Sequence, residues 1–279
     1  MLLRFIIMCA MVLAAIAGLP MEIFESYTWL WAYPLLTLGF IALGGAIGFF
    51  YLLILCKRVN LDREQEEDDP LYRRVMEMYI ESLVPVLRIC LRSKGVNKVP
   101  TEGRFMLVCN HCSDVDPIML LHELPNRQIA FISKKENRDM FLVGPMMHKT
   151  MCQMIDREND REALKTILKC IRLLKEDKVS IGVFPEGRIS LPDRKLHRFR
   201  PGVFKVAQKA QVPIVVCTLK NTKNVLPNMR YWKPTRVDMN VVAVIPVEEV
   251  LAANTTELAE RIYQMMAEDL GPENVAEEA

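Results

Sequence analysis

The chain has 279 residues and a formal net charge of +2, a balance that gives no reason to expect a nucleic-acid partner. Its hydrophobic content is 51% and its mean hydropathy is positive, although 25% of the residues are charged. The apolar residues must therefore be concentrated in part of the chain. The length excludes three domains of ordinary size, and it favours one soluble domain of roughly 200 residues behind a membrane anchor.

The eight cysteines are scattered along the chain and do not form the dense framework of a small secreted domain. Free thiols in a reducing compartment are the simpler interpretation.

Residues 1–60 are predicted to be a membrane anchor, because residues 5–21 and residues 29–56 carry no charged side chain. The first stretch is at the lower length limit for crossing a bilayer, and the second is more than long enough. Trp29, Trp31 and Tyr33 open the second stretch, where an aromatic belt would lie at the lipid headgroups.

The charges around the two stretches predict a hairpin. Arg4 precedes the first stretch, and Lys57 and Arg58 follow the second, whereas only Glu22 and Glu25 lie between them. The positive-inside rule then places both ends of the pair in the cytoplasm. Two alternatives stay open: residues 1–19 are a signal peptide whose cleavage site resembles residues 15–17, or the pair dips into one leaflet without crossing.

Residues 61–99 are predicted to be a linker and an amphipathic helix. Residues 61–70 are polar and acidic and end in a proline, and residues 71–92 carry apolar side chains at helical spacing. Four arginines flank the apolar positions: Arg73, Arg74, Arg88 and Arg92. The helix therefore either lies on the membrane surface or packs as an ordinary core helix.

Residues 100–271 alternate short β-rich runs with helical stretches, which predicts an α/β fold with a mostly parallel or mixed sheet flanked by helices. The expected strands are residues 105–109, 129–133, 179–184, 214–219 and 239–244, and the expected helices are residues 117–123, 161–175, 203–209 and 255–269. Residues 272–279 are expected to be a frayed tail.

His111 lies at the turn that leaves the first expected strand, with carboxylates at Asp114 and Asp116. A carboxylate that accepts the proton of one ring nitrogen leaves the other nitrogen free to take a proton from a hydroxyl group. The alternative is an ordinary turn histidine followed by an aspartate that caps the next helix. Ser113 has no G-x-S-x-G around it, so a nucleophile elbow is not indicated.

Cys109 and Cys112 form a C-x-x-C pair around the same turn. The spacing fits a thioredoxin-like redox site or half of a zinc site. No second C-x-x-C or paired histidine completes a zinc site in this sequence.

A tight turn at residues 184–190 directly follows another expected strand. Its Pro-Glu-Gly-Arg sequence offers backbone N–H groups and the Arg188 guanidinium to a phosphate. Residues 188–209 contain seven lysines or arginines against one acid, which indicates an anionic ligand or a basic face near an anionic membrane.

Four motifs in this order resemble the glycerolipid acyltransferases, and most closely the bacterial 1-acylglycerol-3-phosphate acyltransferases. They are N-H-x-x-x-x-D with His111 and Asp116, I-D-R at 155–157, F-P-E-G-x-x-S at 184–190 and V-P-I at 212–214. The similarity covers about residues 70–245. Many members read F-P-E-G-T-R-S, whereas here Arg188 directly follows Gly187 and Ile189 occupies the usual arginine position.

The resemblance implies that residues 100–271 are an acyltransferase domain. It would move a fatty acyl group from acyl-CoA or acyl-carrier protein to the free hydroxyl of lysophosphatidate, giving phosphatidate. His111 would be the general base and Asp116 its partner. The residues implied to bind the acceptor phosphate are Arg157, Glu186, Gly187 and Arg188. Residues 212–214 would help to shape the acyl side, and no cofactor or metal is expected, because a thioester is already activated.

The expected partners are membrane lipids and the acyl donor, and the expected location is integral in the membrane with the catalytic domain facing the cytoplasm. Within the enzymes, the alternative acceptors are glycerol 3-phosphate and another lysophospholipid. From a different class, the chain would be a catalytically silent lipid-binding scaffold, although His111 and Asp116 are both intact.

Overall fold

The computed structural model describes residues 2–21, 23–24, 27, 29–189 and 194–276. Glu22, Glu25 and Ser190, which the sequence singled out, lie outside the described residues. The chain divides into two compact units, residues 1–62 and residues 63–279.

The first unit is a pair of apolar helices, α1 (Leu2–Gly18) and α2 (Trp29–Lys57). The two helices pack together: the hydroxyl of Tyr33 donates to the carbonyl of Met11 at 3.1 Å, and a Cβ added at Gly44 would lie 2.9 Å from Ile6 Cγ2. Among the described residues, α2 alone is long and apolar enough to cross a membrane, whereas α1 is shorter. The orientation of the pair stays a prediction.

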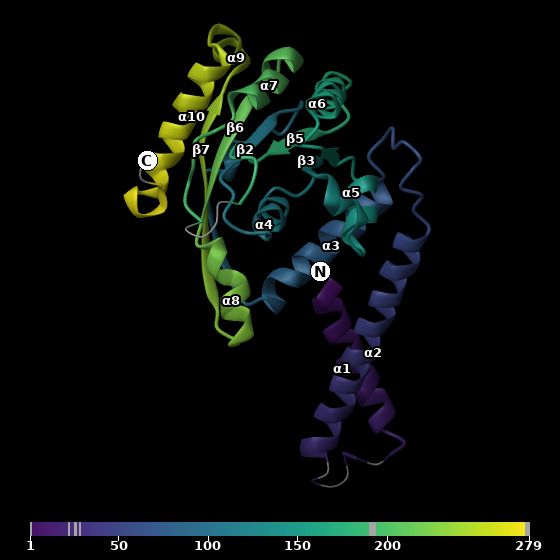
Figure 1. The fold of residues 1–279 in the computed structure, drawn as a ribbon. Coiled ribbons are helices and arrows are strands. Elements are labelled where there is room, and N and C mark those ends of the chain that lie inside the picture. The colour runs from purple at the N-terminus through teal and green to yellow at the C-terminus, as the bar shows by residue number, and fades with distance from the viewer. Residues whose placement is uncertain (1, 22, 25–26, 28, 190–193, 277–279) are drawn as a thin grey trace. The chain divides into compact units, whose positions relative to one another are not determined.

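The second unit is built on a seven-stranded sheet of order β1-β7-β6-β2-β5-β3-β4 (Figure 1). The strands are β1 (Ile89–Lys94), β2 (Met106–Cys109), β3 (Ile129–Lys134), β4 (Gln153–Ile155), β5 (Ser180–Val183), β6 (Ile214–Lys220) and β7 (Thr235–Ile245). The helices are α3 (Pro70–Val86), α4 (Asp116–Glu123), α5 (Val143–Lys149), α6 (Asp160–Lys175), α7 (Lys205–Ala210), α8 (Val225–Arg230), α9 (Val247–Ala252) and α10 (Thr255–Leu270).

The sheet is mixed, as the sequence predicted. Strands β6 and β7 pair antiparallel, and every other neighbouring pair is parallel. The C-terminal ends of five strands therefore lie at one edge of the sheet, which we call the carboxyl edge: β2, β3, β4, β5 and β6.

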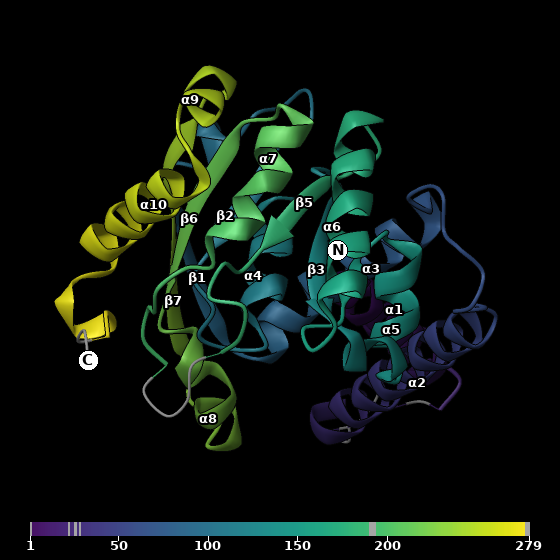
Figure 2. The same cartoon turned by 45° about the horizontal axis from the view of Figure 1, so that its top comes forward.

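Helices cover both faces of the sheet, and the side chains of each strand alternate between two cores. In β6, Ile214 and Val216 point into the core beneath α6, α7 and α10, while Val215 and Cys217 point into the core beneath α3 and α4. Figure 2 shows α6, α7 and α10 together on one face. Because both faces are buried, the central strands are apolar at successive positions.

The predicted helix over residues 71–92 is too long at its C-terminal end. Helix α3 ends at Val86, Arg88 adopts a φ of 53°, and residues 89–94 form strand β1 beside β7. In β1, Ile89 and Leu91 pack against the core beneath α3 and α4. The distant pairing with β7 therefore overrides the helical spacing of the local sequence.

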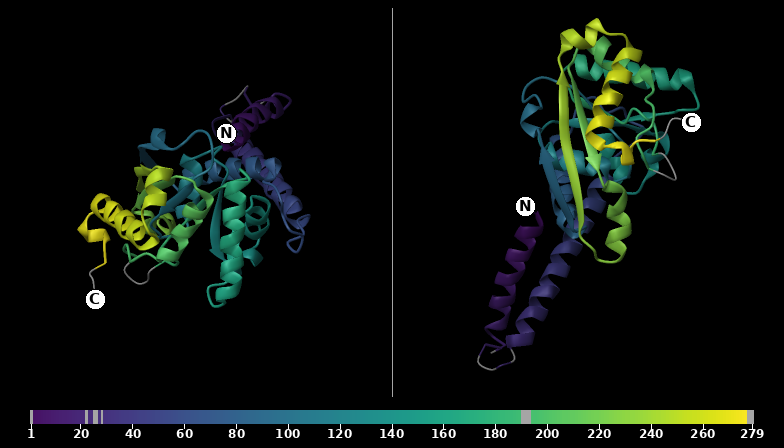
Figure 3. Two further views of the ribbon diagram at one scale, coloured as in Figure 1. Left: turned by 90° about the horizontal axis from the view of Figure 1, so that it is seen from above. Right: turned by 90° about the vertical axis from the view of Figure 1, so that its left-hand side faces the viewer.

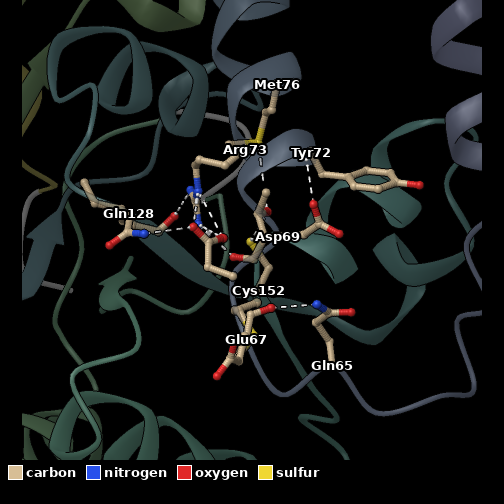
Figure 4. Close-up of polar contacts among 12 residues, drawn as sticks. Gln65, Glu67, Asp69, Tyr72, Arg73, Met76, Gln128 and Cys152 are labelled. Atoms are coloured by element: carbon tan, nitrogen blue, oxygen red, sulfur yellow. Dashed lines mark hydrogen bonds and ion pairs between the residues drawn. The ribbon is translucent and has the colours of Figure 1, made fainter.

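Residues 63–70, predicted to be a linker, are held on the second unit. Asp69 accepts hydrogen bonds from the N–H groups of Leu71 and Tyr72 at the start of α3. Asp68 forms a buried ion pair with Arg73 at 2.8 Å. Arg73 also donates to the carbonyls of Ile129 and Thr150, at 2.8 and 3.0 Å (Figure 4).

Arg73 therefore contacts protein, and the face of α3 that carries Val75 and Ile80 packs as that of a core helix does.

Several short elements have no counterpart in the sequence-based assignment: β4, α5, α8 and α9. The expected strand over residues 239–244 extends in both directions, as β7. The described part of the predicted frayed tail is ordered against the domain, because Val275 bridges to Leu196 and the N–H of Ala276 donates to the Leu196 carbonyl at 3.0 Å.

Candidate active site

The carboxyl edge of the sheet brings three of the four sequence motifs to one side of the domain. His111 follows β2, Glu186 to Arg188 follow β5, and Arg157 follows β4. These strands are parallel, so their ends meet at one edge, which is where open α/β sheets bind ligands.

His111 and Asp116 form a hydrogen-bonded pair, with 2.9 Å between Nδ1 and Oδ2. The same Oδ2 atom accepts the backbone N–H groups of Cys112 and Ser113, at 2.7 and 2.8 Å. Asp116 is completely buried, whereas the His111 side chain keeps 17% of its surface exposed. The carboxylate thus fixes one ring nitrogen and leaves Nε2 for a reacting group. Asp114 is exposed, and the structure pairs His111 with Asp116.

Two neighbours fix the position of the histidine. The Phe184 ring stacks on the imidazole, with 4.1 Å between centroids and 18° between planes. The Asn110 side chain is buried and forms two hydrogen bonds with the backbone of Leu219. Its Nδ2 atom donates to the Leu219 carbonyl at 2.9 Å, and its Oδ1 atom accepts the Leu219 N–H at 2.8 Å. These two hydrogen bonds hold the turn that carries His111 against the end of β6.

Glu186 joins the His111 turn to the segment that leads to α7. Its Oε1 atom accepts the backbone N–H of His111 at 2.8 Å, and its Oε2 atom accepts the N–H of His197 at 3.4 Å. The Glu186 side chain is buried. Both carboxylate oxygens are thus used by backbone donors.

Three arginines lie near one another beside this turn. The pKa of Arg157 is lowered by partial desolvation and then by the positive charges of Arg200 and Arg188, while Glu136 opposes the shift. Gly187 has a φ of 80°, and a Cβ at this position would lie 3.2 Å from Arg200 Nε. Among the described residues, none of the three guanidinium groups forms an ion pair with a carboxylate. Like charges gathered in this way favour an anion between them.

The C-x-x-C cysteines are both free. Burial and the nearby Asp116 carboxylate raise the pKa of the Cys112 thiol to about 12. Burial also raises the pKa of Cys109, which lies within β2. A thiol with a raised pKa is a poor nucleophile at neutral pH. In the part of the chain that the structure describes, no group of three histidine, cysteine or acidic side chains is arranged to hold a metal ion.

The V-P-I motif is not brought to the carboxyl edge. Residues 212–214 lead into the start of β6, where Ile214 pairs with Met106 at the start of β2. His111 lies beyond the other end of β2. In contrast, the sequence interpretation missed Asn110 and Arg200 as members of the site. Arg200 belongs to the basic run after Arg188, which the sequence interpretation did associate with an anionic ligand. The local sequence does not indicate which lysine or arginine of that run contacts Gly187.

Comparison with known proteins agrees with the motifs. A family model described as Acyltransferase matches residues 90–220. These residues contain β2, β5 and the His111, Arg157 and Glu186 positions, and the resemblance to the glycerolipid acyltransferases is confirmed.

Several curated relatives carry the name 1-acyl-sn-glycerol-3-phosphate acyltransferase. The one from Chlamydomonas reinhardtii is 31% identical over 212 residues, covering 73% of this chain and 61% of the relative. The one from Bacillus subtilis is 28% identical over 193 residues, covering 64% of this chain and 92% of the relative. The chain thus spans less than two thirds of the algal relative's length.

The fold of the domain also matches a solved structure. The 1-acyl-sn-glycerophosphate acyltransferase PlsC from Thermotoga maritima superposes with a TM-score of 0.55 and 20% sequence identity, covering 77% of this chain and 86% of that one. The likeness shows that the domain has the α/β fold that the sequence predicted, shared with that structure.

Proposed function

We propose that the protein acylates the free hydroxyl of lysophosphatidate with an acyl group from acyl-CoA or acyl-carrier protein. The observation that carries this proposal is the buried Asp116 carboxylate bonded to His111 Nδ1 beside an unpaired cluster of arginines. The names of the relatives support the same reaction.

The proposed reaction is direct attack. His111 Nε2 takes the proton of the acceptor hydroxyl as the oxygen attacks the thioester carbonyl, and Asp116 stabilises the imidazolium that forms. The C–S bond then breaks, and the departing thiolate takes the proton that His111 holds and is released as the free thiol. The Phe184 ring stacks on the imidazole and restricts its orientation, so the His111 side chain loses little conformational freedom in the reaction step.

The acceptor phosphate would lie on the arginines. A guanidinium group offers a planar fork that matches phosphate oxygens, whereas a carboxylate repels them. We therefore assign Arg157, Arg188 and Arg200 to the phosphate. We propose that Glu186 positions the His111 turn, because its oxygens accept the backbone N–H groups of His111 and His197. Gly187 provides the close approach that brings Arg200 to this turn.

Replacing His111 with alanine tests the base. The His111→Ala protein should lose about 10²–10⁴-fold in turnover, the usual contribution of general base catalysis. Phosphatidate formed from lysophosphatidate and acyl-CoA by the detergent-purified protein is the measurement. His122→Ala, on α4, is the matched control and should keep its activity. Retention of most activity by His111→Ala would contradict the proposed base.

A further inference from the structure

One exposed apolar surface of the second unit has no role in the proposed reaction. Leu226 and Met229 on α8 are exposed, and Tyr231 and Trp232, in the turn that follows, keep 69% and 68% of their surface exposed. Val86, at the end of α3, is exposed as well. We call this surface, formed by α8, residues 231–234 and the end of α3, the α8 tip.

The α8 tip is also basic. Residues 83–94 and 225–236 contain no aspartate or glutamate. The Arg88 guanidinium lies 5.7 Å from the centre of the Trp232 ring and donates to the Trp232 carbonyl at 2.6 Å. Lys233 lies 5.9 Å from the Tyr231 ring, and Arg230 ends α8. Two segments far apart in sequence thus join in one surface of aromatic and cationic side chains.

The α8 tip lies at the same edge of the sheet as His111. Strands β2 and β6 are parallel, with Cys109 opposite Cys217, so the chain leaves both strands at the carboxyl edge. A small pocket lined by Cys112, Asn221 and Lys223, among others, lies between the His111 turn and the chain that leads into α8. Figures 1 and 3 show α8 at one end of β7 and α9 at the other.

We infer that the α8 tip docks on the surface of an anionic lipid bilayer, as a membrane contact additional to α1 and α2. Tyrosine and tryptophan are enriched at the headgroup level, where one part of the ring is apolar and the other is wet. Lysine and arginine are attracted to anionic headgroups. The cores of protein interfaces, in contrast, are depleted in lysine and other charged residues. The inference does not depend on the proposed reaction.

The contact would present the carboxyl edge to the bilayer. A lipid acceptor could then reach His111 with its chain still among other lipids, and the donor would approach from water.

Tryptophan fluorescence in the full-length chain tests the inference. The sequence contains three tryptophans, so Trp29→Phe with Trp31→Phe leaves Trp232 as the sole emitter. The protein is reconstituted into vesicles of phosphatidylcholine, with or without phosphatidylglycerol, in which part of the lipid is brominated high on its acyl chains. Trp232 should be quenched by the brominated lipid, and more strongly when phosphatidylglycerol is present. The effect should weaken from about 0.1 to 1 M salt, because the Debye length falls from about 10 to 3 Å.

Two matched controls make the result specific. Leu251 is exposed on α9, at the opposite edge, so Leu251→Trp in a chain without the other tryptophans should not be quenched. Arg230→Gln with Lys233→Gln should reduce quenching of Trp232, whereas Lys205→Gln with Lys209→Gln on α7 should not. Quenching of Trp232 no stronger than that of residue 251 would overturn the inference. So would a blue-shifted Trp232 that the brominated lipid cannot reach, because that result indicates a protein partner or a second copy.

Discussion

The Asp116 carboxylate serves both the backbone and the histidine. The sequence offered a choice between a catalytic partner of His111 and a residue that merely holds the start of the next helix. The structure does not make Asp116 a helix cap, since α4 has no side-chain cap; its Oδ2 atom accepts two N–H groups of the turn before the helix and faces His111 Nδ1. Asp116 therefore holds the turn and the His111 ring in one arrangement.

The raised pKa of Cys112 gives a prediction for the same turn. A pKa of about 12 keeps the thiol protonated at neutral pH, so Cys112→Ser should retain acyl transfer. Incubation with the acyl donor alone should leave no acyl group on the protein. A trapped acyl-Cys112 would replace direct attack with a covalent mechanism.

Alkylation rates check the direction of the shift. Cys112 should react with iodoacetamide far more slowly than the exposed Cys90 near neutral pH. Its rate should rise only as the pH approaches about 12, because the thiolate is the reactive form. Equal rates for the two cysteines near neutral pH would contradict the raised pKa.

Residue patterns predicted the parts of the site that depend on local sequence. His111 was placed at the end of a strand, and the strand is there as β2. The choice of Asp116 over Asp114 depends on the path of the turn, and the inclusion of Asn110 and Arg200 depends on contacts with Leu219 and Gly187. Such contacts join residues far apart in sequence, and spacing carries no information about them.

At the scale of elements, the boundary between α3 and β1 shows why part of the fold was predicted wrongly. Residues 71–92 have a continuous helical spacing of apolar side chains, but Pro85 lies near the end of α3 and Arg88 has a φ of 53°. The chain therefore turns, and the backbone groups of residues 89–94 pair with β7. The central strands were predicted well because both of their faces are buried, which makes the sequence apolar at every position.

The buried Arg73 should be essential for stability in a way that its neighbour Arg74 is not. Arg73 holds Asp68 and the carbonyls of Ile129 and Thr150, so Arg73→Leu leaves a buried carboxylate without its partner (Figure 4). Breaking such a pair costs about 3–5 kcal/mol. The unfolding midpoint of the purified protein should fall by roughly 10 °C.

Arg74→Leu is the matched control, since Arg74 is adjacent and exposed. It should change the free energy of unfolding by no more than about 0.5 kcal/mol. Equal effects of the two changes would show that the Arg73 network contributes little.

At the scale of the whole molecule, the charges around the two apolar helices predict that the second unit faces the cytoplasm. In a variant without native cysteines, an impermeant thiol reagent added to intact cells should label a cysteine at position 25 and miss one at Glu66. Both should be labelled after permeabilisation. The reverse pattern would exclude the hairpin, and labelling at neither site in intact cells would favour a pair that stays in one leaflet.

The sequence predicted the order of the large elements and the class of the fold, because these follow from hydrophobic patterning and from four motifs. It did not predict β4, α5, α8 or α9, each of seven residues or fewer. Elements of this length contain too few turns or side-chain alternations to produce a periodic signal.

The most direct test of the account compares two acceptors that differ only in the phosphate. Lysophosphatidate and monoacylglycerol share the glycerol backbone and the free hydroxyl, and initial rates with each give kcat/KM. The wild-type protein should prefer lysophosphatidate. Arg157→Lys and Arg200→Lys should each raise the KM for lysophosphatidate by at least about tenfold, because a charged hydrogen bond contributes about 1.5–3 kcal/mol. The KM of the donor should not change, and Lys209→Gln should have no effect. An enzyme that acylates monoacylglycerol as efficiently as lysophosphatidate, with both arginine variants silent, would contradict phosphate recognition at this site.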